Sequence, residues 1–479
     1  MWLAITPPKP QANMLRATMN KPSIVKKQII RKYKKIINMK VLKFGGTSVG
    51  SAERMKGVVK LISDGETKIV VLSAMSGTTN SLIEFTNYLK NQNVIGACEH
   101  STFLQDKYKH TIKELYSTEE YAQKATAKVS EVFNHLRNLA QQPLTDNLEK
   151  EIIAQGEIMS TNMVTLYMQE LGLDAVLLNS FDFMRLSSNG EPDLGYIREH
   201  LLPLVDLDAK GRIYIAQGFV CLNYLGNIDN LQRGGSDYTA TLIGAAVNAS
   251  EVQIWTDIDG MHNNDPRIVD NTSPVHHLHF EESAELAYFG AKILHPTCIL
   301  PAKLTGTPVR LLNTMDPSAR GTLIDNNLTQ PGEIKAIAAK DGITAVKIKS
   351  GRMLLAYGFL RKVFEVFETY KTSIDMICTS EVGVSVSIDD DRKLEQIVDE
   401  LQKYGTVTVD RDMCIICVVG DLNWEHVGFE ARAMEAMKDI PVRMVSYGGS
   451  NYNISFLVRE EDKERALRSL SNTIFNAKK

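Results

Sequence analysis

A lysine followed closely by two glycines and two hydroxyl residues is the first candidate site in the sequence. The segment K-F-G-G-T-S-V, from Lys43 to Val49, ends a short apolar run that is typical of a strand. Glycines let successive backbone N–H groups converge on one anion, and a helix beginning near Ser51 would add the positive end of its dipole. The segment therefore predicts a phosphate site, although it matches neither the Walker A loop nor the G-x-G-x-x-G motif.

A second glycine pair occurs in R-G-G-S-D, from Arg233 to Asp237, at the expected start of another helix. Together, the two segments resemble signatures of the aspartate kinases, which belong to the amino-acid kinase superfamily. The resemblance extends from Met39 to the C-terminus, with several further motifs in the family's order.

The elements that must position these residues follow an alternating pattern. Between Met39 and about Asn327, apolar strand patterns at 68–73, 175–179, 213–217 and 252–256 alternate with helical patterns. This alternation predicts an α/β fold with a mostly parallel sheet, whose ligands bind beyond the carboxyl ends of the strands. Residues 100–150 lack strand patterns and are interpreted as a helical insert. The resemblance implies the three-layer sandwich of amino-acid kinases for residues 39–330.

The remaining region, 331–479, contains a weak internal repeat of helix, strand, turn and strand. The predicted helices are 359–370 and 429–437, and the predicted strands are 373–377, 382–388, 441–445 and 452–458. The resemblance implies tandem α+β ACT modules that bind amino-acid effectors and interleave, with residues 343–350 expected to pair into the second module.

Residues 1–38 carry nine lysines and arginines and no acidic residue, which predicts a disordered basic extension. The net charge of −3 and a pI near 6.4 give no reason to expect nucleic acid, and no apolar stretch approaches the length of a membrane span. Six scattered cysteines are typical of reduced thiols, so we expect a cytoplasmic protein.

Two further clusters could suggest metal binding. Cys414 and Cys417 fall in an apolar run where positions i and i+3 face opposite sides of a strand, and the histidines at 276, 277 and 279 precede a predicted helix without a carboxylate or cysteine partner. Both clusters are interpreted as structural, and no metal-ligating residue is predicted.

The resemblance implies phosphoryl transfer from ATP, with Mg²⁺, to L-aspartate. Lys43 and Lys292, the latter in F-G-A-K-I-L-H-P, would neutralise the phosphates, and Asp237 would orient the cluster or reach the metal. The expected nucleotide-binding residues are Lys43, Gly45, Gly46, Thr47, Ser48, Ser73, Gly77, Thr256, Asp257, His262, Arg267 and Lys292. The expected aspartate-binding residues are Thr79, Glu157, Phe219, Arg233 and Ser236.

The sequence departs from the family's pattern beside this site. His262 stands where a tyrosine is common, Gln232 where glycine is usual, and Asp229-Asn230 where two threonines are usual. These changes leave each charged group in place, so they bear on kinetic constants rather than on the reaction class.

The function inferred is an ATP-dependent aspartate kinase that makes 4-phospho-L-aspartate, the first step of lysine, threonine and methionine biosynthesis. The alternatives are a kinase acting on glutamate or acetylglutamate, and an amino-acid sensor without catalysis.

Feedback inhibition by lysine through the first ACT module is also expected, with Asp375 pairing with the effector's ammonium. The expected effector residues are Met353, Gly358, Phe359, Leu360, Ser373, Ile374, Asp375, Thr379, Ser380 and Glu381. Threonine is the alternative effector, because Ala356 and Tyr357 replace the commoner serine and arginine. A homodimer formed through the ACT modules is expected.

Overall fold

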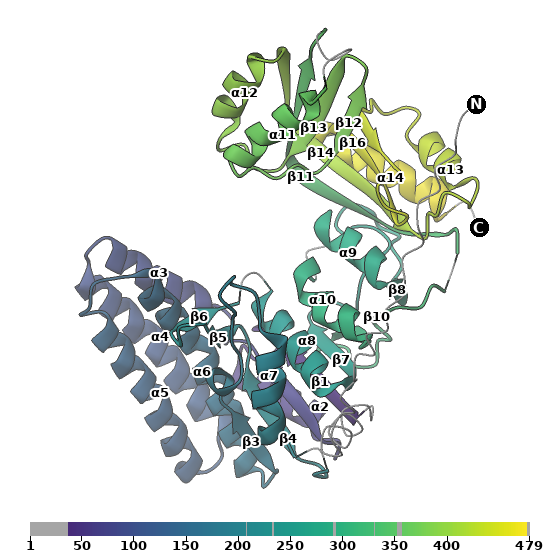
Figure 1. Ribbon diagram of the computed structural model, residues 1–479. Helices are drawn as coiled ribbons and strands as arrows, with labels where there is room; N and C mark the ends of the chain where they lie inside the picture. The colour runs from purple at the N-terminus through teal and green to yellow at the C-terminus, as the bar shows by residue number, and fades with distance from the viewer. Residues whose placement is uncertain are drawn as a thin grey trace, which may run out of the picture.

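The computed structural model describes residues 37–206, 208–231, 234–290, 294–329, 331–351 and 357–476. Two bodies follow one another along the chain, each built on its own sheet, and α9 (Phe280–Tyr288) lies where they meet (Figure 1).

The first sheet has eight strands in the order β3-β4-β2-β1-β7-β9-β10-β8. Every pairing from β3 to β9 is parallel, β9 and β10 are antiparallel, and β10 pairs with β8 in parallel. The predicted mostly parallel sheet is therefore confirmed. The strands are β1 (Ile37–Phe44), β2 (Lys68–Leu72), β3 (Ala175–Leu178), β4 (Ile213–Gln217), β7 (Ala249–Thr256), β8 (His277–His279), β9 (Val309–Asn313) and β10 (Thr322–Asp325).

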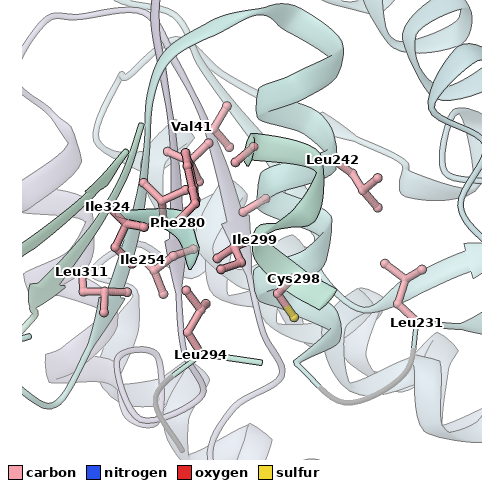
Figure 2. Close-up of a cluster of buried hydrophobic side chains, with 14 of the residues drawn as sticks. Val41, Leu231, Leu242, Ile254, Phe280, Leu294, Cys298, Ile299, Leu311 and Ile324 are labelled. Carbon is pink, nitrogen blue, oxygen red and sulfur yellow. The ribbon is translucent and has the colours of Figure 1, made fainter. Parts of the chain in front are cut away.

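Helices cover both faces of this sheet, because neighbouring residues of its strands point to opposite sides and both sides are apolar. On β1, Val41 belongs to one buried cluster and Leu42 and Phe44 to another. Figure 2 shows the first cluster, where Val41 and Ile254 of the sheet face Ile299 of a covering helix. The helices are α2 (Ala52–Ile62), α3 (Thr78–Lys90), α4 (Val94–Leu115), α5 (Glu119–Leu139), α6 (Asp146–Glu170), α7 (Leu194–Leu201), α8 (Gly235–Val247), α9 and α10 (Pro296–Thr305).

The helical insert predicted for residues 100–150 is confirmed, since α4, α5 and the start of α6 fill it. In Figure 1 α4 and α5 form an outer layer beside α3 and α6. A small hairpin, β5 (Val220–Leu222) and β6 (Ile228–Asn230), packs against α6.

The second body, from Ile334 to Ile474, contains the predicted ACT modules and is named the regulatory body. It is built on a six-stranded antiparallel sheet in the order β12-β13-β11-β14-β16-β15. Its strands are β11 (Ile334–Lys349), β12 (Ile377–Ser380), β13 (Gly383–Ile388), β14 (Thr406–Gly420), β15 (Met444–Ser446) and β16 (Asn453–Arg459). Its helices are α11 (Phe359–Thr369), α12 (Leu394–Gln402), α13 (Phe429–Ala436) and α14 (Lys463–Ile474).

Two long strands, β11 and β14, are shared by both repeats. The first half of β11, Ile334–Lys340, pairs with the half of β14 that adjoins β16, whereas Thr344–Lys349 pairs with β13 and with Thr406–Asp410. The expectation that residues 343–350 pair into the second module is therefore wrong. One continuous strand with a register irregularity after Lys340 serves both repeats, and it is the upstream half that reaches the second.

Two predicted strands begin later than expected. The strand predicted at 373–377 is β12, which starts at Ile377, and only isolated ladder bonds, such as that from the Asp375 N–H to the Ser387 carbonyl, precede it. The strand predicted at 441–445 is β15, which starts at Met444, after a proline that has no N–H to donate to a ladder. The boundary near residue 330 stays a prediction; β10 ends at Asp325 and β11 begins at Ile334.

The cysteine and histidine clusters lie at packed or capping positions of the fold. Cys414 and Cys417 belong to buried clusters on opposite sides of β14. His279 is the N-cap of α9. Its ring Nδ1 accepts a bond from the Glu281 backbone N–H, and its backbone N–H donates to the Glu282 carboxylate. Within the described ranges, no three His, Cys, Asp or Glu side chains could share a metal ion, and no helix has the length and apolar character of a membrane span.

Candidate active site

A pocket of about 380 Å³ opens at the carboxyl ends of β1 and β2. It brings together nine of the predicted site residues from five separate segments of the sequence. These nine are Lys43, Gly46, Ser73, Gly77, Thr79, Glu157, Phe219, Ser236 and Asp237.

The charged centre of the pocket is an ion pair between β1 and α8. Lys43 Nζ lies 2.6 Å from Asp237 Oδ1, and the two side chains are only 12% and 13% exposed. Because the pair is sheltered, water screens it much less than it screens a surface pair.

The backbone around the pocket is shaped for an anion. A Cβ on Gly46 would lie 2.8 Å from the Ala74 carbonyl oxygen, so only glycine allows this approach of the β1 loop to the β2 loop. Gly77 and Gly234, with φ of +80° and +73°, cap α3 and α8, and neither cap supplies a side-chain hydrogen bond. The Thr78 N–H at the start of α3 donates to the Met75 carbonyl, and no side chain caps the other first-turn N–H groups of the two helices, which are suited to phosphate oxygens.

Glu157 forms the buried acidic wall of the pocket. It lies inside α6 and is 4% exposed, as its apolar sequence neighbours indicated. Its Oε1 accepts the Ala74 N–H at 3.2 Å, whereas its Oε2 is buried and has no hydrogen-bond partner in the described part of the chain. Burial raises the pKa of Glu157 to about 8, and the bond from Ala74 offsets only part of that effect. A buried carboxylate oxygen without a partner favours a cationic ligand.

Phe219 is held over the start of α8 in a strained conformation, with φ +68°. Its N–H donates to Thr239 Oγ1 at 2.9 Å, and a Cβ on Gly235 would lie 2.5 Å from the phenyl ring. Nearby, Ser73 Oγ donates to Ser236 Oγ at 2.9 Å. The aromatic wall and the hydroxyl pair thus belong to one rigid junction between β2, β4 and α8.

The other predicted nucleotide residues that the structure describes do not line this pocket. Ser48 and Thr256 lie at adjacent strand ends and both bond to Thr314, through its hydroxyl at 2.8 Å and its N–H at 2.8 Å. Thr256 also donates to Asp257 at 3.1 Å. Gly45 and Thr47 belong to the same β1 loop.

His262 and Arg267 are engaged elsewhere. The His262 ring bonds to Thr272 and Asp259, both at 2.9 Å. The Arg267 side chain is 83% exposed and pairs with Asp265, whose pKa it holds below the usual value. Arg233, Lys292 and Gln232 lie outside the described residues.

Some lining residues were missed by the sequence reasoning. Ser76 and Asn80 line the pocket and could have been found, because they follow β2 at the binding edge of the sheet. Thr314 follows β9 at the same edge, but a single threonine after a strand carries no distinctive signal.

The predicted effector residues surround the start of α11 and the edge strand β12. Gly358 is the left-handed N-cap of α11, with φ +83° and no side-chain cap, and Phe359 and Leu360 form the first turn. Thr379 and Ser380 belong to β12, which Glu381 follows, while Ser373, Ile374 and Asp375 precede it. Met353 lies outside the described residues.

The comparisons with known proteins agree with this fold and site. Residues 38–313 match the amino acid kinase family, and residues 416–474 match the ACT domain. The chain is 34% identical to Aspartokinase 1, chloroplastic, of Arabidopsis thaliana, over 91% of this chain and 80% of that protein. It is 32% identical to Lysine-sensitive aspartokinase 3 of Escherichia coli, over 91% of this chain and 99% of that protein.

Solved structures lead to the same class. E. coli aspartokinase III in complex with lysine and aspartate (T-state) matches with a TM-score of 0.75 and 31% identity, over 91% of this chain and all of that one. The same enzyme with aspartate and ADP (R-state) matches with a TM-score of 0.75 and 30% identity, with the same coverage. Fold and pocket therefore define an amino-acid kinase with a regulatory ACT region. Within that class, the chain belongs to the aspartokinase family.

Proposed function

We propose that this protein transfers the γ-phosphoryl group of ATP to the side-chain carboxylate of L-aspartate, giving 4-phospho-L-aspartate and ADP. The observation that carries the proposal is a pocket that joins the Lys43–Asp237 pair and two helix starts without a side-chain cap to the buried carboxyl of Glu157. One half suits a polyphosphate and the other half suits an ammonium group.

In the reaction, a carboxylate oxygen of aspartate attacks the γ-phosphorus, the bond to the bridging oxygen breaks, and ADP leaves with that electron pair. Both reactants are anions, so catalysis depends on alignment and on positive charge. Lys43 supplies a full charge at the transferring group, and the N–H groups of α3 and α8 add donors that need no reorganisation.

Substrate selection would rest on the charged groups at the amino-acid end of aspartate. Glu157 in its ionised form would bind the α-ammonium through the oxygen that has no other partner. Arg233 would bind the α-carboxylate, for which its planar fork is suited. The Phe219 ring and Thr79 would close the pocket around the substrate.

The residues present also fit magnesium. Of the lining residues, Asp237 and Glu157 carry carboxylates, and Mg²⁺ in nucleotide sites is commonly held by one carboxylate together with phosphates and waters. Asp237 is the side chain that would hold the ion, which when bound screens the phosphate charges.

The proposal includes feedback inhibition by L-lysine in the first ACT module. The start of α11 would receive the effector's carboxylate and Asp375 its ammonium. Support comes from the E. coli relative, which is named for its lysine sensitivity and was solved with lysine. We further propose a cytoplasmic homodimer formed through the ACT modules.

A coupled assay of ADP release tests the proposal. Turnover is expected with L-aspartate and ATP, far lower turnover with L-glutamate or acetylglutamate, and inhibition by L-lysine rather than L-threonine. Equal or better turnover with glutamate would transfer the assignment to another amino-acid kinase, and no turnover with any acceptor would favour a sensor.

A further inference from the structure

One face of α9 fastens the catalytic body to the regulatory sheet. Its polar contacts recur every three residues: Glu282 pairs with Lys335 of β11 at 2.7 Å, Glu285 accepts a bond from Asn453 of β16, and the Tyr288 hydroxyl donates to Asp375 at 2.6 Å. Residues three apart on a helix are neighbours on its surface, so these contacts hold α9 against β11 and β14, where the two bodies meet (Figure 1).

The last of these contacts belongs to a buried charged cluster. The Asp375 side chain is 0% exposed, and its Oδ1 accepts from both Tyr288 and Lys340 Nζ, the latter at 3.0 Å. Lys340 also pairs with Asp389 at 2.9 Å and lies 4.4 Å from the centre of the Tyr288 ring.

The protonation of the two donors is stable. Burial raises the pKa of Tyr288, and the bond to Asp375 raises it further, so the phenol keeps its proton. Burial lowers the pKa of Lys340, but the bonds to Asp389 and Asp375 outweigh this effect and leave a net increase.

The second oxygen of Asp375 is used differently from the first. Oδ2 is buried and has no hydrogen-bond partner within the described ranges. An unpartnered buried carboxylate oxygen is costly, and a ligand ammonium would remove that cost. One oxygen of this carboxylate is thus bonded to the catalytic body, and the other is buried without a partner.

The end of α9 is also held through the backbone. Gly290, with φ +119°, lies so close to β11 that a Cβ there would be 2.0 Å from the Ala339 carbonyl oxygen. Tyr288 and Gly290 therefore rest against neighbouring positions of one strand, Lys340 and Ala339. Lys292, the lysine proposed for the nucleotide, follows two positions after Gly290 in the sequence.

The second repeat provides an internal comparison. Arg443 and Asp375 each precede a buried methionine at the same point of the repeat, and Arg443 bonds to Asp410 at 2.7 Å. In the second repeat, Arg443 lines a cavity of about 630 Å³, whose lining residues all come from the regulatory body. A catalytic-domain side chain therefore fills the cluster position in the first repeat and does not line it in the second.

We propose that Tyr288 is the positioning residue through which the effector site acts on the catalytic domain. Asp375 Oδ1 holds Tyr288, Oδ2 binds the ammonium of a cationic amino-acid effector, and the two bonds share one negative charge. Effector binding then changes how firmly the end of α9 is held, and by reciprocity the position of α9 changes effector affinity. The inference rests on the proposed effector site and names the residue that transmits its occupation.

The test uses Tyr288→Phe in the full chain, which removes the hydroxyl and keeps the ring over Lys340. L-Lysine binding is measured by isothermal titration calorimetry, and inhibition is measured as ADP release with saturating aspartate and ATP. We expect lysine still to bind, with a dissociation constant changed by no more than about tenfold, the factor that corresponds to loss of a hydrogen bond to a charged group, while the inhibition produced by saturating lysine is lost or falls strongly. Unchanged inhibition, or parallel loss of binding and inhibition, would overturn the proposal.

A measurement without effector separates this inference from the proposed function. Hydrogen exchange of the amides in residues 280–290 is expected to accelerate in Tyr288→Phe and in Asp375→Asn, with no further increase in the double variant. Asp410→Asn, which changes the partner of Arg443 at the matching position of the second repeat, is the control and should leave this exchange unchanged. If lysine does not inhibit the parent, the assignment of lysine as effector fails, but the exchange measurement still tests whether Tyr288 couples Asp375 to α9. Unaltered exchange in both single variants would overturn that coupling.

Discussion

The replacement of Glu157 by glutamine tests whether the pocket binds an ammonium group. Burial raises the pKa of this carboxyl to about 8, so at pH 7 only about a tenth of the ligand-free enzyme carries the carboxylate that an ammonium needs. At pH 9 about nine-tenths does. The parent's KM for aspartate is therefore expected to fall about tenfold between pH 7 and pH 9, with a smaller change in the KM for ATP.

In Glu157→Gln this pH dependence should disappear. At pH 9 the KM for aspartate should exceed the parent value by about tenfold or more, because a hydrogen bond to a charged partner contributes about 1.5–3 kcal/mol. Initial rates at varied aspartate and saturating ATP, across pH 6.5 to 9, measure both effects. Glu149→Gln, on the same helix but paired with Lys90 at the surface, is the matched control. A Glu157→Gln enzyme with the parent's KM and pH profile would refute the assignment.

The same pKa has a consequence for stability. The pKa of Glu157 in the folded protein lies above the ordinary value of 4.5. The contribution of this carboxyl to the free energy of unfolding is therefore fully present below about pH 4.5 and is lost as pH rises through about 8. The total loss is on the order of 5 kcal/mol at about 1.4 kcal/mol per pKa unit. Glutamine cannot ionise, so the melting temperature of Glu157→Gln should exceed that of the parent by a margin that grows from pH 5 to pH 8.5. A constant margin would contradict the burial argument.

Three further changes test other parts of the proposal. Lys43→Met should lower kcat about 10²- to 10³-fold, because it removes positive charge at the transferring phosphoryl group, and near-normal kcat in a folded variant would sink the assignment. Arg233→Leu should raise the KM for aspartate about tenfold or more and affect the KM for ATP much less; equal losses for both ligands would assign Arg233 to the scaffold. A chain that starts at Met39 should keep full activity and nearly the same melting temperature, since residues 1–38 lack apolar periodicity, and a large drop in melting temperature would contradict this.

Local patterns in the sequence were sufficient for most elements of the catalytic body. Strands at 68–72, 175–178 and 213–217 occur where short apolar runs predicted them, because a parallel strand buried on both faces must be apolar throughout. The regulatory strands were less predictable. β11 continues through both repeats, and its pairing depends on partners up to 86 residues away (Ile334 and Gly420), which a local pattern cannot encode.

The sequence by itself determined which chemical groups are available and at which edge of the sheet they gather. Glycine pairs after strands and at helix starts permit close backbone approach to an anion wherever the chain folds around them, so Lys43, Gly46 and Asp237 could be assigned to one site in advance.

Tertiary structure alone decided what surrounds those groups. The Glu157 pKa depends on desolvation by neighbours from other segments, and the role of Asp375 depends on Tyr288, which reaches it across 87 residues. Burial and hydrogen bonding between distant segments arise only when the chain packs, and both act through distances that no residue pattern records. For this reason the sequence could identify Asp375 as a candidate ligand for an effector, while only the fold placed it against the catalytic body.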